Sequence, residues 1–323
     1  MRERAMKKLF NYCPVHGYAE EIANYPGGMK KYLADNNLDG LEIYVYGTEP
    51  FEKNYAKECV GAHLKFFPYW LDFYQGKCEE VFHQLGSREK VQEYYLGAKS
   101  KEEWLEKIRQ NIRAALLLEP EYLVWHVADC NLEETFSFDF QHSDEEIIAA
   151  TCEIINSLED CLSEDVLLLF ENLWWPGLRL RDTQAVEMLF RGIRKIKVGL
   201  MLDTGHLMNT NPSLRSEAEG ISYIKETVNR HGIYKNYIKG IHLSCSLSGT
   251  YREGKSWEER KERTPEFIMG HIANIDQHKN FKEAGLKDLL SFLNPDYLVH
   301  ELFYDNLKEL AEFIQQQSLL LKK

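Results

Sequence analysis

The chain predicts a parallel (β/α)8 barrel that forms one domain over residues 1–323, with two long loops at its mouth. Eight short apolar segments alternate with helical patterns, and no Pro- or Ser-rich linker divides the chain. Most of the apolar segments end in an Asp, a Glu or a His. Because a parallel barrel gathers the C-terminal ends of its strands on one face, we expect these side chains to meet there.

The predicted strands are short and rich in Val, Ile, Leu, Phe and Tyr, as buried parallel strands are. They cover residues 7–13, 40–46, 59–66, 121–128, 166–171, 197–203, 237–243 and 297–302.

The predicted helices follow most of these strands, and several begin with acidic or capping residues. They cover residues 17–36, 101–118, 144–162, 182–194, 215–231, 284–293 and 305–319. A full helix over 47–58 is not indicated. Two connections, 64–100 and 244–283, are long enough that we expect them to wall the mouth and decide the substrate.

Composition narrows the protein class. The 323 residues include 44% hydrophobic ones, enough for a large core, and carry a net charge of −12. This charge argues against nucleic-acid binding by bulk charge, although a local basic strip could still bind DNA. Seven scattered cysteines without a C-x-x-C pair, no leader-like N-terminus and no membrane-length apolar stretch together predict a cytoplasmic protein with no membrane partner. Nothing in the sequence sets the oligomeric state.

The sharpest motif is Asp203-Thr-Gly-His206, which directly follows a predicted strand. Glu171, His242 and Glu301 end the neighbouring strands, so with Asp203 they offer one divalent ion a set of nitrogen and oxygen ligands. His300 precedes Glu301, and strand side chains alternate between faces. We therefore expect His300 to point away from the site, towards the helices.

Four further residues have the chemistry of metal ligands: His63, His126, Asp276 and His278. Each has a structural alternative, because a strand histidine can be a hydrogen-bonded core residue and Asp favours turns. They occur together with Glu171, Asp203, His242 and Glu301, and this favours a centre with more than one metal ion. An enzyme with one metal ion would not need these four further ligands.

The segments FEN (170–172), LDTGHLMN (202–209), GIHLS (240–244) and VHEL (299–302) resemble those of the xylose-isomerase-like TIM-barrel superfamily. That superfamily contains sugar isomerases and epimerases as well as endonuclease IV. For the isomerase branch the resemblance implies one ion on Glu171, Asp203, His242 and Glu301. The two glutamates would then move protons, and His206 would contact the substrate.

The full ligand pattern is more similar to that of endonuclease IV, which holds three zinc ions. The resemblance implies a first ion on His63 and His126, with Glu171 bridging to a second on Asp203, His242 and Glu301. The third ion would be held by His206, Asp276 and His278. The D-x-H pair lies 34 residues after His242, and the KNFKEAGL that follows it lacks the Gly-x-Gly run usual in that family.

Aromatic and basic residues close to these segments are candidates for substrate contacts. Besides His206 we single out Lys65, Trp70 and Trp174, which could meet an anion or stack on a ring. The alternative is that such aromatic residues pack the long loops onto the barrel.

The sequence thus predicts a metal-dependent enzyme with Glu171 and Glu301 as catalytic residues. We expect a multinuclear zinc phosphoester hydrolase of the endonuclease IV type, with up to three ions and a small phosphoester or DNA as substrate. The alternative is a sugar or sugar-phosphate isomerase or epimerase with one manganese or zinc ion. A non-catalytic metal-binding barrel is the third hypothesis.

Overall fold

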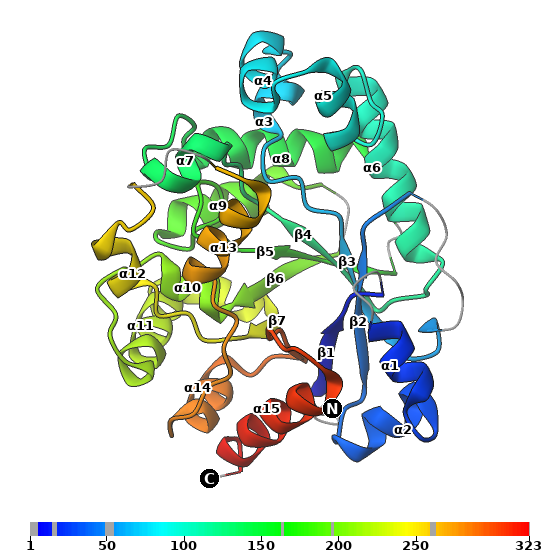
Figure 1. Cartoon of the computed structure of the whole chain (residues 1–323), viewed down its shortest axis with the longest axis vertical. Helices are drawn as coiled ribbons and strands as arrows, with labels where there is room; N and C mark the ends of the chain where they lie inside the picture. The colour runs from blue at the N-terminus through cyan, green and yellow to red at the C-terminus, as the bar shows by residue number, and fades with distance from the viewer. Residues whose placement is uncertain are drawn as a thin grey trace.

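The computed structural model describes residues 6–14, 18–48, 55–162, 165–194, 197–258 and 263–322. Eight parallel strands close into a barrel in the order in which they occur along the chain, and helices surround it (Figure 1). The predicted fold class is therefore confirmed. The strands are β1 (Lys7–Tyr12), β2 (Gly40–Val45), β3 (Cys59–Leu64), β4 (Tyr122–His126), β5 (Leu167–Glu171), β6 (Val198–Asp203), β7 (Ile238–Leu243) and β8 (Tyr297–His300).

All eight predicted strands occur, and the main differences lie at their C-terminal ends. β3, β4 and β8 each stop two residues before the predicted end. Consequently His126 is the last residue of β4, and Glu301 lies just beyond β8. The strand ends carry most of the candidate ligands at the barrel mouth, and backbone pairing fixes the direction of several, since His126 pairs with Glu171 and Asp203 with His242.

The helices that cover the barrel begin at polar caps. Ser143 and Ser216, for example, form reciprocal capping boxes with the glutamates three residues on. The helices are α1 (Tyr18–Asn24), α2 (Gly28–Asp35), α3 (Leu71–Tyr74), α4 (Cys78–Leu85), α5 (Arg88–Tyr94), α6 (Lys101–Leu116), α7 (Leu132–Ser137), α8 (Asp144–Ser157), α9 (Thr183–Gly192), α10 (Thr204–Asn209), α11 (Glu217–Arg230), the 3-10 helix η2 (Gly232–Tyr237), α12 (Gly249–Gly254), α13 (Pro265–Ile275), α14 (Leu286–Leu293) and α15 (Leu307–Leu320).

One helix prediction was wrong, because the expected helix over 17–36 is two helices. The break covers residues 25–27, which include Pro26, and both glycines after the proline have left-handed backbones, with φ 88° at Gly27 and 63° at Gly28. Only glycine adopts these angles without strain, so the Pro-Gly-Gly sequence ends α1 and sets a new direction for α2.

The two long connections contain short helices of their own. Residues 64–100 fold into α3, α4 and α5, whereas 244–283 contain α12 and α13. In Figure 1, α4 and α5 lie beyond α6 at one end of the molecule, while α13 lies beside β5 and β6 in the view. Of the segment 47–58, where no full helix was expected, residues 49–54 lie outside the described part of the chain.

Most of the apolar core lies in two layers, and a third, smaller cluster around Trp174 and Trp175 lies beyond the strand ends. One fills the barrel below its mouth and includes Leu9, Val124, Leu169 and Val299; the other packs the strands against the helices. The inner layer forms a dry floor under the strand ends, so charged side chains above it are shielded from water. All seven cysteines are free thiols. Within the described ranges, the helices lack the length and apolar character that crossing a membrane requires.

Candidate metal centre

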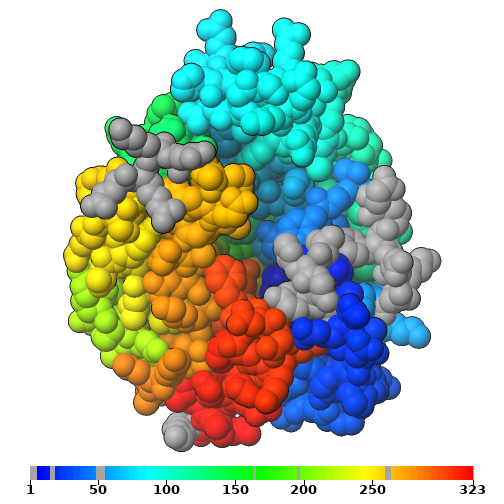
Figure 2. Space-filling model, viewed as in Figure 1, coloured from blue at the N-terminus to red at the C-terminus, as the bar shows by residue number. Residues whose placement is uncertain are grey.

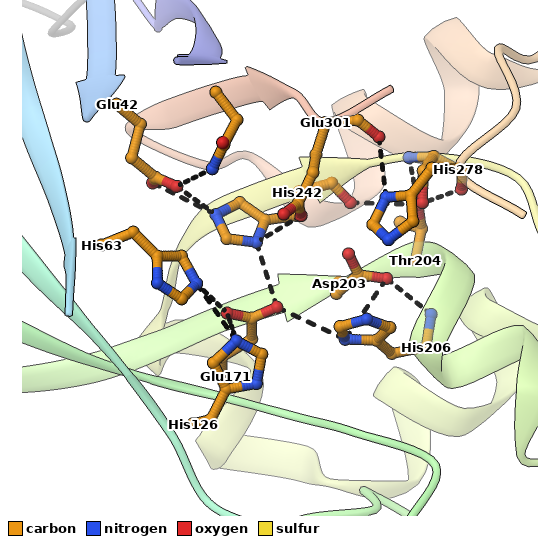
Figure 3. Close-up of polar contacts among 12 residues, drawn as sticks. Glu42, His63, His126, Glu171, Asp203, Thr204, His206, His242, His278 and Glu301 are labelled. Atoms are coloured by element: carbon orange, nitrogen blue, oxygen red, sulfur yellow. Dashed lines mark hydrogen bonds and ion pairs between the residues drawn. The ribbon is translucent and has the colours of Figure 1, made fainter. Parts of the chain in front are cut away.

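The structure brings all nine predicted ligands together at the C-terminal ends of the strands (Figure 3). They form three groups in which the ligand atoms lie within 4.8 Å of one another, and Glu171 belongs to two of them. The groups are His63, His126 and Glu171; Glu171, Asp203, His242 and Glu301; and His206, Asp276 and His278.

The D-x-x-H motif works as a helix cap. Asp203 ends β6 and caps α10, and its Oδ1 accepts the backbone N–H of His206 at 2.5 Å. This turn sets both side chains towards the same point. Among the residues that the structure describes, the buried Oδ2 of Asp203 has no hydrogen-bond partner. Asn172 fixes the end of β6 with two bonds, accepting from the N–H of Asp203 at 2.9 Å and donating to its carbonyl at 3.1 Å.

Three of the histidines are anchored in the same way. The Nδ1 atoms of His63, His206 and His278 lie 2.9, 2.9 and 3.1 Å from the backbone carbonyls of Leu64, Asn172 and Glu301. A carbonyl only accepts hydrogen bonds, so Nδ1 carries the proton in each ring. In the neutral ring, Nε2 then presents a lone pair.

Each of these Nε2 atoms faces another acceptor. His63 Nε2 lies 3.1 Å from Glu171 Oε2 and 3.1 Å from His126 Nε2. His206 and His278 direct their Nε2 atoms at the same oxygen, Asp276 Oδ2, at 3.1 and 2.7 Å. Lone pairs that converge in this way need a proton or a cation between them.

Glu171 lies at the centre of the cluster and is fully buried. Its Oε2 lies 3.1 Å from the Nε2 atoms of both His63 and His126, and its Oε1 lies 3.1 Å from His242 Nδ1. The two oxygens therefore face different histidine groups, which is the geometry of a bridging carboxylate.

Glu301 is the acidic ligand that reaches towards solvent, with a side chain that is 16% exposed. Its Oε2 lies 2.8 Å from His242 Nδ1 as an ion pair, and among the described residues this oxygen makes no hydrogen bond of regular geometry. A short contact without a hydrogen bond is expected where two atoms can share a cation.

His278 has a strained backbone, with φ 42°. Seven other non-glycine residues in the described ranges also have a positive φ, so this conformation alone does not mark a functional residue. The N–H of Phe303 donates to the His278 carbonyl at 3.0 Å and helps to hold the residue in place.

Charge inside this buried cluster is balanced by protons. Burial alone would lower the pKa of His278, but the Asp276 carboxylate raises it to about 10. Burial, assisted by neighbouring carboxylates, raises the pKa of Asp203 to about 8. Burial lowers the pKa of His126 to about 3. The cluster thus holds extra protons on some ligands, which bound cations would replace.

These observations fit divalent metal ions. The donors are imidazole nitrogens and carboxylate oxygens, which suit zinc or manganese, and cysteine takes no part in any of the three groups. The orphaned oxygens of Asp203 and Glu301 and the facing Nε2 atoms of His63 and His126 are further places where a cation would satisfy unpaired groups.

Glu42 is a site residue that the sequence analysis missed. It lies on β2, is fully buried, and its Oε1 is 2.9 Å from His242 Nε2. The available signal was a single charged residue inside an otherwise apolar strand, because a buried carboxylate requires partners.

The residues predicted to contact substrate lie at different depths. Trp174 is buried with its ring centre 5.2 Å from that of His206, and its indole N–H has no partner in the structure. Trp70 is also buried and donates its indole N–H to the Ala128 carbonyl. The ammonium of Lys65 lies over the Phe67 ring. Their roles with a substrate stay predictions.

Other aromatic rings border the cluster more closely. Phe66 stacks on His126 with ring centres 4.4 Å apart, and Phe303, 55% exposed, lies 4.6 Å from the His278 ring. Figure 2 shows this face of the molecule hollowed near its centre, beside the red-orange segment that follows β8.

The long connections contribute unequally to this region. Phe66 opens the 64–100 segment beside His126, whereas residues from Phe73 onward line a groove of about 1530 Å³ with the start of α6 and Glu153 of α8, and no cluster residue lines it. The 244–283 segment ends at Asp276 and His278 and therefore carries ligands itself. We had expected both segments to wall the mouth, and that expectation stays a prediction.

A closed (β/α)8 barrel with a buried histidine–carboxylate cluster at its mouth defines the structural class. The chain is similar to a putative xylose isomerase from Rhodospirillum rubrum (14% identity, TM-score 0.55, 97% of this chain and 99% of that one). It is also similar to endonuclease IV from Thermus thermophilus (11% identity, TM-score 0.54, 98% of this chain and 99% of that one). A third similar structure is a D-tagatose 3-epimerase-like protein (16% identity, TM-score 0.52, 98% of this chain and 97% of that one).

At identities this low the similarities show the fold alone, a closed (β/α)8 barrel of the kind that these proteins share. No family description matches the chain, and no curated protein matches it. Activity must therefore be argued from the site.

Proposed function

We propose that this protein is a metal-dependent phosphoester hydrolase with a multinuclear centre of the endonuclease IV type. The observation that carries the proposal is the group His206, Asp276 and His278, which converges on one carboxylate oxygen beside the site built around Glu171. A single ion on Glu171, Asp203, His242 and Glu301 would leave that group without a function.

Charge supports an anionic substrate. Four ligand carboxylates cannot neutralise three divalent ions, so a filled centre would be positive and would attract a phosphate group. When bound, the ions supply Lewis acidity to the phosphoryl group and to the attacking water. Zinc is the expected metal, and a local attraction of this kind does not require a basic protein surface.

The chain's own residues have distinct roles in this mechanism. Glu171 bridges the two histidine groups with its separate oxygens and keeps the ligands at fixed spacing. Glu301 is partly exposed and stands where it could take a proton from the attacking water. The Trp174 indole N–H is a spare donor beside His206 for a bound phosphoester.

An isomerase or epimerase with one manganese or zinc ion is the second candidate. The group formed by Glu171, Asp203, His242 and Glu301 is sufficient to bind one ion, and the two glutamates approach the same His242 nitrogen from different strands. They would exchange a proton with a carbon next to a polarised carbonyl of a sugar.

Ligand deletion separates the two candidates. His63→Ala and His278→Ala each remove a ligand only if the centre is multinuclear. We expect each to lose an ion by elemental analysis and to abolish cleavage of an abasic-site oligonucleotide or a small phosphodiester. In an isomerase with one ion, the metal content would stay constant and turnover of a ketose panel would fall only modestly.

His300→Ala is the matched control, because His300 is another buried histidine at the end of a strand. As expected from strand alternation it points to the helices, where its Nδ1 accepts from Gln317 Nε2 on α15 at 2.9 Å. Its removal should lower stability and leave the metal content unchanged. If His63→Ala and His278→Ala both keep full metal and activity, the hydrolase assignment is wrong.

A further inference from the structure

Glu42 is a buried charge held by donors from three other strands. It lies in the middle of β2, whose sequence GLEIYV is otherwise apolar. Its Oε1 accepts from Asn11 Nδ2 at 3.0 Å, and its Oε2 accepts from the Tyr122 hydroxyl at 2.8 Å. His242 Nε2 lies 2.9 Å from Oε1 and 3.1 Å from Oε2. A fully buried carboxylate with this set of partners is a built feature of the barrel interior.

The neighbouring strand leaves room for this arrangement. A Cβ added to Gly61 on β3 would lie 2.1 Å from Cζ of the Tyr122 ring and 2.4 Å from its hydroxyl oxygen. Any other residue at position 61 would displace the ring, so glycine is what allows Tyr122 on β4 to reach over β3 to Glu42 on β2.

His242 differs from the other anchored histidines of the cluster. His63, His206 and His278 place Nδ1 on backbone carbonyls and present Nε2. His242 instead directs Nε2 at Glu42 and Nδ1 at Glu171 and Glu301 (Figure 3). A neutral imidazole has one N–H, so the group that takes this hydrogen decides which nitrogen is free for a metal.

We propose that Glu42 is a positioning residue for the metal centre. It accepts the Nε2–H of His242 and thereby turns the Nδ1 lone pair towards the oxygens of Glu171, Asp203 and Glu301. Its negative charge also makes Nδ1 a stronger electron donor than a carbonyl anchor would, since carboxylate–histidine pairs tune a bound metal. This inference rests on the metal-binding part of the proposed function and holds for either chemistry.

A direct ligand role for Glu42 is the competing explanation, because Glu42, His63 and His242 also lie close enough to surround an ion. The hydrogen bonds favour the positioning role. Glu42 already accepts from Asn11 and Tyr122, and His63 directs its free nitrogen to Glu171. An ion ligated by Glu42 would compete with these donors.

The test compares Glu42→Gln with Glu121→Gln. Glu121 pairs with Lys7 and accepts from the Tyr297 hydroxyl at 2.9 Å, so the control makes the same change at the opposite end of the barrel. Zinc affinity of the chelator-treated proteins is measured by competition with a chromophoric chelator, and bound ions are counted by elemental analysis. We expect Glu42→Gln to lower the zinc affinity of one site by about 10- to 100-fold. Glu121→Gln should leave the zinc affinity unchanged.

Tyr122→Phe is a second, milder variant that removes one of the donors to Glu42. If Glu42 is a positioning residue, Tyr122→Phe should lower zinc affinity, as Glu42→Gln does. If Glu42→Gln fails to fold, the zinc affinity of Tyr122→Phe tests the proposal on its own. In the direct-ligand role it would free an oxygen of Glu42, so unchanged or tighter zinc binding in Tyr122→Phe overturns the proposal. Long-range ¹H–¹⁵N spectra of the zinc-loaded wild type should show a proton on Nε2 of His242.

Two failures are distinguishable. If wild-type protein takes up no divalent ion, the proposed function and this inference both fail. Suppose instead that the wild type binds zinc and that folded Glu42→Gln has the same zinc affinity, the same ion count and the same His242 tautomer. Only the positioning role is then overturned.

Discussion

At the scale of single residues, the site depends on which ring nitrogen each histidine presents. For His63, His206 and His278 a backbone carbonyl holds Nδ1, so Nε2 is the nitrogen presented to the site. A backbone acceptor is not removed by substituting another side chain. His242 relies on a carboxylate instead. Of the four cluster histidines whose rings are anchored by a hydrogen bond, one therefore depends on a replaceable side chain and three are set by backbone carbonyls.

Glu171→Gln should abolish either of the two activities proposed for this protein. The substitution keeps the shape but removes the charge that faces His63, His126 and His242, so both bridging and proton transfer are lost. We expect activity to fall at least about 10²-fold. Steady-state rates with phosphodiester and ketose substrates, together with ion content, provide the measurement. A fully active, fully loaded Glu171→Gln protein would place the reaction elsewhere.

At the scale of elements, one buried aspartate attaches the 64–100 segment to the end of β4. Asp129 Oδ1 accepts the backbone N–H groups of Trp70 and Leu71 at 2.6 and 2.8 Å, where α3 begins. Burial raises the pKa of Asp129 to about 7, although these donors and the charge on His142 oppose the shift. The carboxyl group therefore binds a proton more tightly in the folded than in the unfolded protein.

Asp129→Asn should consequently change how stability depends on pH. Between the ordinary Asp pKa of 3.8 and the folded value of about 7, the folded protein holds the extra proton, so wild-type stability falls as pH rises through that window and levels off above it. Asn keeps an acceptor oxygen but has no charge to bury. The difference in melting temperature between variant and wild type should grow from pH 5 to pH 7. A constant difference would mean that Asp129 is ionised throughout.

The 244–283 segment is held by a different residue, His271 on α13. Its Nε2 donates to the Thr135 carbonyl on α7 at 2.8 Å, its Nδ1 accepts from the Tyr251 hydroxyl at 2.9 Å, and its ring stacks on Phe136. Burial lowers the pKa of His271, which favours the neutral ring that this bonding needs. Because α13 leads directly into Asp276, this packing also supports two ligands of the third group.

His271→Ala should therefore loosen α13 and weaken the neighbouring metal position. The loss of two buried hydrogen bonds costs roughly 1–3 kcal/mol, and we expect faster amide exchange over 265–275 and the release of one ion. Met269→Ala, at a 65% exposed position of the same helix, is the control and should change neither quantity. Equal exchange rates in the two variants would show that His271 does not hold this segment.

The sequence predicted these elements to different extents for physical reasons. Buried parallel strands are distinctive apolar runs, so all eight were found, and the ligands stood out because they end those strands. The split between α1 and α2 depends on backbone angles at Gly27 and Gly28, which a helical pattern can span. Glu42 was missed because it meets His242 only through barrel closure, 200 positions away in the chain.

At the scale of the whole molecule, the barrel encloses a group of charges that repel one another unless something neutralises them. The carboxyl groups of Glu42, Glu171 and Asp203 are fully buried above an apolar floor. Without cations, protons must fill this role, as the raised pKa of Asp203 and of His278 indicates. The folded state should accordingly bind metal far better than the unfolded chain does, and metal should contribute to global stability.

Removing metal should therefore lower the melting temperature of the entire barrel. One ion at a hundred times its Kd stabilises the folded state by about 2.7 kcal/mol, which in a chain of this length corresponds to a shift of roughly 4 °C. Scans of chelator-treated protein with and without added zinc measure this shift, and Glu171→Gln in the same assay should show a smaller one. Protons occupy the same groups, so the shift should shrink as pH falls. If wild type melts at one temperature with and without zinc, the mouth of this barrel is a proton-bridged polar core, and the metal-dependent reading of its histidines would have to be abandoned.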